Sequence, residues 1–192
     1  LAKENLSDTR YNYEVIFEDD QLDPKKTASA ANKLISIDKV DALVSISSGT
    51  GNVVAPIAKQ NKVVHFGIAS DVNIANGDYN FIHWTPPSEE NKVFVKELQK
   101  RGITKIGLFV LNQQGAIAKM DDLRRRINKT DIEIVTDQSF NFGEKDFRSI
   151  ISKAKNSGAE IYVLMAFSPE LEILAKQIKE AGITTPLTSI EA

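Results

Sequence analysis

The chain has 192 residues, of which 42% are hydrophobic and 26% are charged, as in an ordinary globular protein, and its length suits one large or two small units. It carries 24 lysines and arginines against 26 aspartates and glutamates, and the net charge of −2 excludes a strongly basic nucleic-acid-binding protein and a polyacidic tail. Because there is no cysteine, disulfide scaffolds, thiolate metal sites and cysteine nucleophiles are excluded as well.

In the first half of the chain, short apolar runs alternate with amphipathic stretches, which is typical of a parallel α/β fold. Asp23 followed by Pro24 predicts the start of a helix, with the aspartate as N-cap and the proline in the first turn. The small-residue loop Ser47–Asn52 separates a buried strand from a short helix. The predicted strands are Tyr13–Phe17, Ala42–Ile46, Val63–Phe66 and Asn80–Trp84, and the short helix is Val53–Gln60.

Two consecutive prolines, Pro86 and Pro87, interrupt this pattern, because they fit neither a central strand nor the interior of a helix. Ser88 is the expected cap of the next helix, which stops at Gly102. The alternation of strands and helices then restarts. Its expected strands are Lys105–Leu111, Glu133–Thr136, Ile161–Ala166 and Pro186–Ile190, and its expected helices are Ala116–Asn128, Lys145–Asn156 and Ser168–Gly182.

The two halves of the chain resemble each other in architecture. Asp23–Ser47 and Glu144–Ser168 have the same length, and both run from a helix through a turn and a strand to a small residue that opens another helix. We therefore predict an α/β protein of two Rossmann-like parallel-sheet lobes: residues 1–85, an incomplete N-terminal lobe, and 86–192, most of a second lobe. Because open parallel sheets bind ligands beyond the carboxyl ends of their strands, two facing lobes form a cleft.

The loop Ser47–Asn52 is the most informative candidate site, since it lies between a strand and a helix. Exposed N–H groups and the positive end of the helix dipole attract an anion there, and the hydroxyls of Ser48 and Thr50 add donors. The loop also begins a dinucleotide fingerprint, but Val54 stands in place of its third glycine. A small carboxylate, a nucleotide and a plain tight turn are the three interpretations.

The turn after the next strand offers a second candidate. It places the Ala69 amide and the Ser70 hydroxyl beside the first loop if the two strands are neighbours, and an ordinary connection capped by Asp71 is the alternative. His65 and His83, the two histidines of the chain, each lie inside an apolar strand run without a partner at metal-ligand or triad spacing. We expect buried or edge histidines at these positions.

Two charged runs are interpreted as surface features. Residues 18–20, with Asp23, show no regular spacing of metal ligands and predict a solvated strand end followed by a helix cap. Residues 124–126, three arginines that follow Asp121 and Asp122, predict a solvated helix face with ion pairs at i, i+3 and i+4. Neither a nucleophile with its base nor a P-loop is present, so we expect no enzyme activity, no metal and no cofactor.

Several short motifs stand in order along the chain: Tyr13–Gln21, Asp23-Pro24, Ala30–Ile35, Lys39–Leu43, Ser168–Glu170 and Ala181–Ile183. Together they resemble the type I periplasmic binding proteins over nearly the whole chain. Within that family, the branch that they resemble is the leucine/isoleucine/valine-binding proteins of branched-chain amino acid ABC transporters. The resemblance implies a two-lobed, Venus-flytrap solute-binding protein that closes over an amino acid and delivers it to a membrane permease.

The resemblance also implies the ligand-binding residues. The loop at Ser48 binds the ligand carboxylate through a hydroxyl and a backbone N–H. The turn at Ala69 and Ser70 supplies a further carbonyl and hydroxyl, and Glu191 meets the α-ammonium group. On the cleft interpretation alone, the Glu191 carboxylate would face the Ser48 loop, with a surface glutamate as the alternative.

Two positions depart from the family pattern. Gln114 stands where family members often have a tyrosine before a glycine, and Phe167 is an aromatic residue without a hydroxyl just before Ser168-Pro169. Both belong to the predicted ligand site, and the departures leave open whether the ligand has a branched aliphatic side chain.

The resemblance implies partners and a location. The expected partners are an amino acid or related carboxylate and an ABC transporter permease, without nucleic acid, for a monomer that is secreted or lipid-anchored in the periplasm or outside the cell. Since the family has a strand before Leu1 and a further third after Ala192, we expect the chain to be a fragment. The alternatives are a ligand-sensing domain of a receptor or regulator, a nucleotide-dependent α/β enzyme, and a relative that binds a protein partner instead of a solute.

Overall fold

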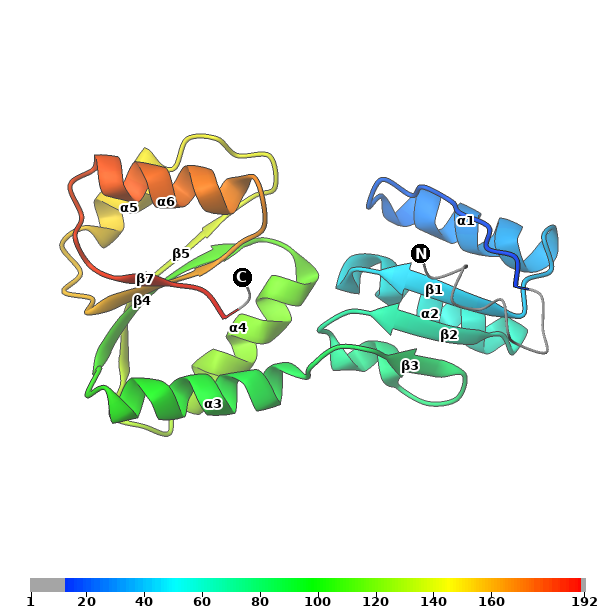
Figure 1. Cartoon of the computed structure of the whole chain (residues 1–192), viewed down its shortest axis with the longest axis horizontal. Helices are drawn as coiled ribbons and strands as arrows, with labels where there is room; N and C mark the ends of the chain where they lie inside the picture. Colours follow the sequence, from blue (N-terminus) through cyan, green and yellow to red (C-terminus); the bar gives the residue numbers. More distant parts are fainter. Residues whose placement is uncertain (1–12, 191–192) are drawn as a thin grey trace.

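The computed structural model describes residues 13–190, which form two parallel-sheet units (Figure 1). The N-terminal unit contains α1 (Pro24–Ser36), β1 (Ala42–Ile46), α2 (Ser48–Asn61), β2 (Val64–Ile68), the 3-10 helix η2 (Val72–Ala75) and β3 (Asn80–Ile82). The C-terminal unit contains α3 (Pro87–Lys100), β4 (Lys105–Leu111), α4 (Gln114–Ile127), β5 (Glu133–Phe140), α5 (Arg148–Ala154), β6 (Ile161–Met165), α6 (Glu170–Glu180) and β7 (Leu187–Thr188).

The strands of both sheets are parallel, which confirms the predicted α/β class. The first sheet has the order β1-β2-β3, with Ser45 paired to Gly67, and the second has the order β5-β4-β6-β7, with Phe109 paired to Leu164. In a parallel sheet all carboxyl ends lie at one edge. The turns that follow β1 and β2 therefore share one edge of the first sheet, and those that follow β4, β5 and β6 share one edge of the second.

Local chemistry sets the ends of several helices. The carboxylate of Asp23 accepts hydrogen bonds from the N–H groups of Lys25 and Lys26, both at 2.9 Å, which confirms it as the N-cap of α1. The predicted cap at Ser88 is wrong: α3 begins one residue earlier, at Pro87, because proline already has the backbone angle of a first helical residue and needs no N–H partner there. Gly102 follows α3 with φ of +68°, as expected of a terminating glycine.

The C-terminal unit has a core on both faces of its sheet. Helices α3 and α4 lie on one side of the sheet, and α5 and α6 lie on the other (Figure 1). The central strand β4 is accordingly buried at every residue from Ile106 to Leu111, and β6 is buried from Tyr162 to Met165. The rings of Phe109 and Tyr162 lie 5.5 Å apart within this core.

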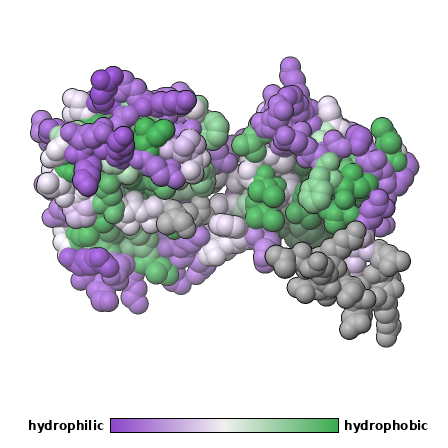
Figure 2. Space-filling view, turned by 45° about the horizontal axis from the view of Figure 1, so that its top comes forward, coloured by the Kyte–Doolittle hydropathy of each residue, from purple (hydrophilic) through white to green (hydrophobic). Residues whose placement is uncertain are grey.

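The N-terminal unit covers one face of its sheet. Leu43 packs with residues of α1 and α2, and burial then alternates along β1 and β2. The opposite face stays exposed, with Phe66 and Phe81 stacked 5.5 Å apart on it. Apolar side chains gather on the surface of this unit, at the right of Figure 2. The exposed residues of this face, called the open sheet face below, are Val44 (67% exposed), Ile46 (70%), Phe66 (44%) and Phe81 (52%).

Two sequence expectations in this unit are wrong. Tyr13–Phe17 forms no strand, because among the described residues it pairs with neither sheet, and its Val15 and Phe17 side chains are 66% and 87% exposed. The expected loop Ser47–Asn52 is already helical from Ser48 onward, since Ser47 caps the helix. The two glycines of this segment, which are poor helix formers, disguise the helix start in the sequence.

Candidate ligand site between the two units

The two units meet where α2 and α4 begin. A Cβ on Gly115 would lie 3.0 Å from the Ser48 Oγ and 3.1 Å from the Gln113 Oε1, which is tight, so a side chain there would push these groups away by a few tenths of an ångström and glycine favours the approach. Ser48 is 2% exposed. The N-termini of two helices from two different sheets therefore come together at this point, and both carry the positive end of a helix dipole.

The backbone at Ser47 is shaped to present Ser48. Ser47 has φ of 88°, a left-handed value for a residue other than glycine, and its side chain accepts a hydrogen bond from the Thr50 N–H at 3.2 Å. This cap satisfies one free donor of the first helical turn and turns the chain sharply from β1 into α2. Such strain is typical of functional turns.

Thr50 belongs to a polar network inside the N-terminal unit. Its hydroxyl donates to Asp20 at 2.9 Å, and the Thr27 hydroxyl donates to the same carboxylate oxygen at 2.6 Å. Burial works to raise the pKa of Asp20, but these hydrogen bonds and one from the Leu22 N–H outweigh it and hold the pKa below its ordinary value. Asp20 therefore stays ionised and ties the segment before α1 to the turn at Ser47.

A chain of hydrogen bonds runs from Ser48 into the C-terminal unit. The Asp71 N–H donates to the Ser48 Oγ at 3.2 Å, and the Asn52 amide donates to the Asp71 carboxylate at 2.8 Å. The same Asn52 amide donates to the Gln114 Oε1 at 2.8 Å. The structure thus brings together three residues singled out from sequence, Ser48, Asp71 and Gln114, and adds Asn52, whose signal was its place one helical turn after Ser48.

A cavity of about 410 Å³ lies between the two units beside this chain, within the usual size range of small-molecule sites. Ser70, Asp71 and Asn73 of the N-terminal unit line one side of it. Its other side is lined by Pro87 and Ser88 at the start of α3 and by one stripe of α4: Gln114, Ile117, Ala118, Asp121, Asp122 and Arg125.

The remaining predicted site residues lie as follows. Ala69 is 5% exposed and packs against Ile74 directly after β2. Phe167 is 38% exposed and follows β6 at the carboxyl edge of the second sheet. Glu191 lies outside the described residues. The ligand-binding roles of all these residues stay predictions.

The sequence prediction of a buried or edge histidine at position 65 is confirmed by a buried polar network. The Ser45 Oγ lies 2.8 Å from the His65 Nε2, and the His65 Nδ1 lies 2.9 Å from the Asn80 Oδ1. All three residues are at most 4% exposed. Ser45, His65 and Asn80 stand in the order of a nucleophile, a base and an orienting residue, but their burial excludes substrate. We therefore assign the network to the packing of the N-terminal unit. Burial lowers the pKa of His65 against the opposing effect of its bond to Asn80.

The described residues show neither a cluster of metal ligands nor a complete dinucleotide fingerprint. Among residues 13–190, no group of three or more histidine or acidic side chains could hold a metal ion. Asp19 and Asp20 instead accept hydrogen bonds from the N–H groups of Gln21 and Leu22, both at 2.9 Å. Val54, in place of the third glycine of a dinucleotide fingerprint, is buried in the core with Leu43.

Within the same described part of the chain, no helix combines the length and apolar character needed to cross a bilayer.

Comparison with known proteins gives a consistent result. The family model described as periplasmic binding protein matches residues 9–190. A curated leucine-, isoleucine-, valine-, threonine- and alanine-binding protein of Pseudomonas aeruginosa is 26% identical over 175 residues, which cover 88% of this chain and 47% of that protein.

Solved structures share the fold at low sequence identity. A leucine-binding protein of Thermotoga maritima has a TM-score of 0.86 at 18% identity and covers 98% of this chain and 55% of its own. A solute-binding protein of an ABC transporter from Rhodopseudomonas palustris, in complex with 3,4-dihydroxybenzoic acid, has a TM-score of 0.82 at 20% identity. The match covers 92% of this chain and 50% of that protein. The chain spans about half the length of the curated relatives that it matches.

Proposed function

Since the chain belongs to the periplasmic binding protein family, we propose that it captures an amino acid or a similar small zwitterion or carboxylate between its two lobes and passes it to an ABC transporter permease. The lobe boundary that we propose lies at residues 85 and 86, between β3 and α3. In this proposal the protein acts as a monomer in the periplasm or at the cell surface, and it binds its solute without chemical conversion.

The observation that carries the proposal is the approach of Ser48 to Gly115. It brings the starts of α2 and α4, from two different sheets, to one point. First-turn N–H groups and helix dipoles attract a carboxylate, and a hydroxyl beside them adds a donor. Because Ser48 is 2% exposed in this structure, a carboxylate would enter when the lobes separate and would then contact both lobes at once.

The other predicted residues complete the proposed site. The Ala69 carbonyl and the Ser70 hydroxyl would bind polar groups of the ligand, and Glu191 would pair with an ammonium group. Gln114 would contribute from the second lobe, and Phe167 would supply an apolar wall. Thr50, whose hydroxyl already donates to Asp20, would support the turn that presents Ser48.

The proposed mechanism is closure of the two lobes. A ligand shifts the balance between open and closed arrangements only by the difference in its affinity for the two. Contacts made to one lobe alone leave that balance unchanged, whereas contacts shared by Ser48 and groups of the second lobe favour closure. Charge-assisted hydrogen bonds at both poles of a zwitterion contribute about 1.5–3 kcal/mol each.

A thermal-shift screen against amino acids, their amides and small aromatic acids tests the proposal. A ligand at a hundred times its Kd should stabilise the chain by about 2.7 kcal/mol. Ser48→Ala and Glu191→Gln should each reduce that shift, and Ser152→Ala, an exposed serine of α5, is the matched control. If no member of the panel changes the melting temperature, the proposal is contradicted. If aromatic acids alone stabilise the chain, the ligand is a carboxylate rather than a zwitterion.

A further inference from the structure

A basic groove lies between α3 and α4, away from the turn at Ser48. Its volume is about 380 Å³. Five of its nine lining residues are lysine or arginine, and one is acidic. The lining residues are Lys92, Val95, Lys96, Gln99, Asp122, Arg125, Arg126, Lys129 and Thr130. We call this set the α3–α4 groove.

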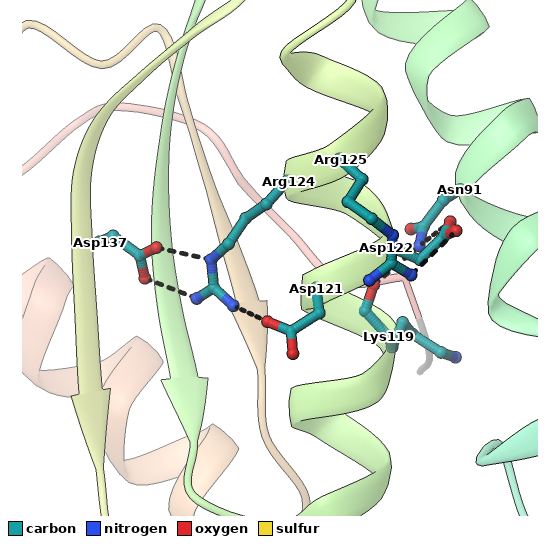
Figure 3. Close-up of polar contacts among 7 residues, drawn as sticks. All are labelled: Asn91, Lys119, Asp121, Asp122, Arg124, Arg125 and Asp137. Atoms are coloured by element: carbon teal, nitrogen blue, oxygen red, sulfur yellow. Dashed lines mark hydrogen bonds and ion pairs between the residues drawn. The ribbon is translucent and has the colours of Figure 1, made fainter. Parts of the chain in front are cut away.

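The three consecutive arginines of α4 do not form one face. Arg124 points toward β5, where its guanidinium donates to both oxygens of Asp137 at 2.8 and 2.9 Å, while Arg125 and Asp122 point toward α3 (Figure 3). Arg125 and Arg126 both line the groove. The predicted solvated face is thus divided between an ion pair with the sheet and the α3–α4 groove.

The groove has more positive charge than its own carboxylate can balance. Asp122 accepts from Arg126 at 2.7 Å and lies 3.6 Å from Arg125, so it already faces two cations. Burial would raise the pKa of Asp122, but hydrogen bonds from Arg126 and Asn91 outweigh it and keep the carboxyl ionised.

The groove lysines lack strong partners. Lys92 lies 3.8 Å from Glu89 with both side chains more than half exposed, a pair that contributes little. Among residues 13–190, neither Lys96 nor Lys129 forms an ion pair. In a chain with a net charge of −2, this groove is a local concentration of positive charge.

The shape of the groove favours an extended anion over a small one. Lys92 and Gln99 are seven residues apart on α3, which is roughly 10 Å along the helix axis, and a single phosphate cannot contact both ends. Val95 and the aliphatic parts of the lysines provide an apolar floor. We propose that the α3–α4 groove binds an acidic segment of a partner protein, with carboxylates at successive turns and an apolar side chain over Val95.

This inference does not depend on the proposed solute site. Asp122 and Arg125 line both the groove and the cavity between the two units, but the proposed solute contacts are made by Ser48 and the turns beside it, and the groove lysines Lys92, Lys96 and Lys129 line only the groove. The two proposals can therefore fail separately, and each is measured with its own ligand.

The probe is a fluorescent helical peptide of about four turns, with glutamates spaced by four residues on one face and leucines between them, titrated onto the chain at low and high salt. Its control has glutamine in place of glutamate. We expect anisotropy to rise with the acidic peptide only and the affinity to fall steeply with salt. Binding of the glutamine peptide with equal affinity would overturn the inference.

Charge reversal locates the binding surface. Lys92→Glu with Lys96→Glu should weaken peptide binding by about tenfold or more, because both lysines lie on the groove. Lys153→Glu with Lys176→Glu, exposed lysines of α5 and α6, makes the same change in net charge and should alter binding by less than about twofold. Equal losses in the two double variants would show a non-specific charge effect and overturn the inference.

Two further anions test the class of partner. Pyrophosphate and vesicles that contain an anionic lipid should bind more weakly than the acidic peptide and should not depend on Lys92 and Lys96. If either binds more tightly than the peptide and loses affinity in the groove variant, the groove takes phosphate groups, and the assignment to an acidic protein segment is wrong.

Discussion

The two sheets have the same parallel construction but differ in how they are covered. In β4 every residue from Ile106 to Leu111 is buried, because helices lie on both faces of its sheet. In β1 burial alternates, and Val44 and Ile46 remain exposed. Parallel strands are normally buried on both faces and are apolar throughout.

The sequence of β1 does not match its environment. Ala42–Ile46 is an almost continuous apolar run, as expected for a strand between two layers, yet one of its faces is open. The residues are therefore suited to a cover that the described part of the chain does not provide. We infer that the C-terminal unit is the more stable of the two and that the open sheet face is poorly protected from water and from association.

The largest effect should come from the core of the C-terminal unit. Phe109 is fully buried against Tyr162, so Phe109→Ala should lower the free energy of unfolding of that unit by about 3–5 kcal/mol. Hydrogen exchange resolved by peptide measures this loss separately for each unit.

Phe81→Ala is the counterpart on the open sheet face. Phe81 is 52% exposed and has one aromatic neighbour, Phe66, so its loss should lower the stability of the N-terminal unit by less than about 1.5 kcal/mol. Equal losses from the two substitutions would mean that the two sheets are equally covered in solution.

An intermediate effect should come from pH and should be confined to the N-terminal unit. His65 is buried neutral and its pKa lies below the ordinary 6.5, so the unfolded chain binds a proton that the folded chain does not. The contribution of neutral His65 to the free energy of unfolding is fully present above pH 6.5. It is lost as the pH falls, by at most about 1.4 kcal/mol per pH unit.

Hydrogen exchange from about pH 7.5 to about pH 5 measures this loss, after correction for the intrinsic rate. The C-terminal unit has no histidine and serves as the internal reference. His65→Gln should flatten the pH dependence of the N-terminal unit, and the exposed His83→Gln should leave it unchanged. If the pH dependence of the N-terminal unit remains in His65→Gln, groups other than His65 cause it.

The smallest change in stability should come from making the open sheet face polar. Val44→Thr with Ile46→Thr should alter the free energy of unfolding by less than about 1 kcal/mol, since both side chains are already about two-thirds exposed. The same variant should bind less of a hydrophobic dye and associate less at high concentration. A loss of several kcal/mol would mean that the face is covered in solution.

The sequence predicted most of the fold, because the relevant signals are local. Asp23-Pro24, Gly102 and the apolar runs act within a few residues, and the helices and strands that they predict are present except at Tyr13–Phe17. The prediction of a strand at Tyr13–Phe17 was wrong because a strand also needs a neighbour, and an apolar run does not show whether one is available.

The candidate site was harder to predict. Ser48 follows from a turn between a strand and a helix, which is a local pattern. Asn52 does not, since it acts through contacts to Asp71 and Gln114, which lie 19 and 62 residues away. Nor does the sequence show that the small size of Gly115 favours the approach of Ser48, because the two residues meet only when the two units are placed together.

The contact between Asn52 and Gln114 joins two neutral amides, one from each unit. A hydrogen bond of this kind is hardly weakened by dissolved ions, whereas an attraction between exposed charges fades over roughly 8–10 Å at ordinary ionic strength. A titration with sodium chloride should therefore weaken the binding of an acidic segment to the α3–α4 groove. The hydrogen bond between Asn52 and Gln114 should persist over the same range of salt.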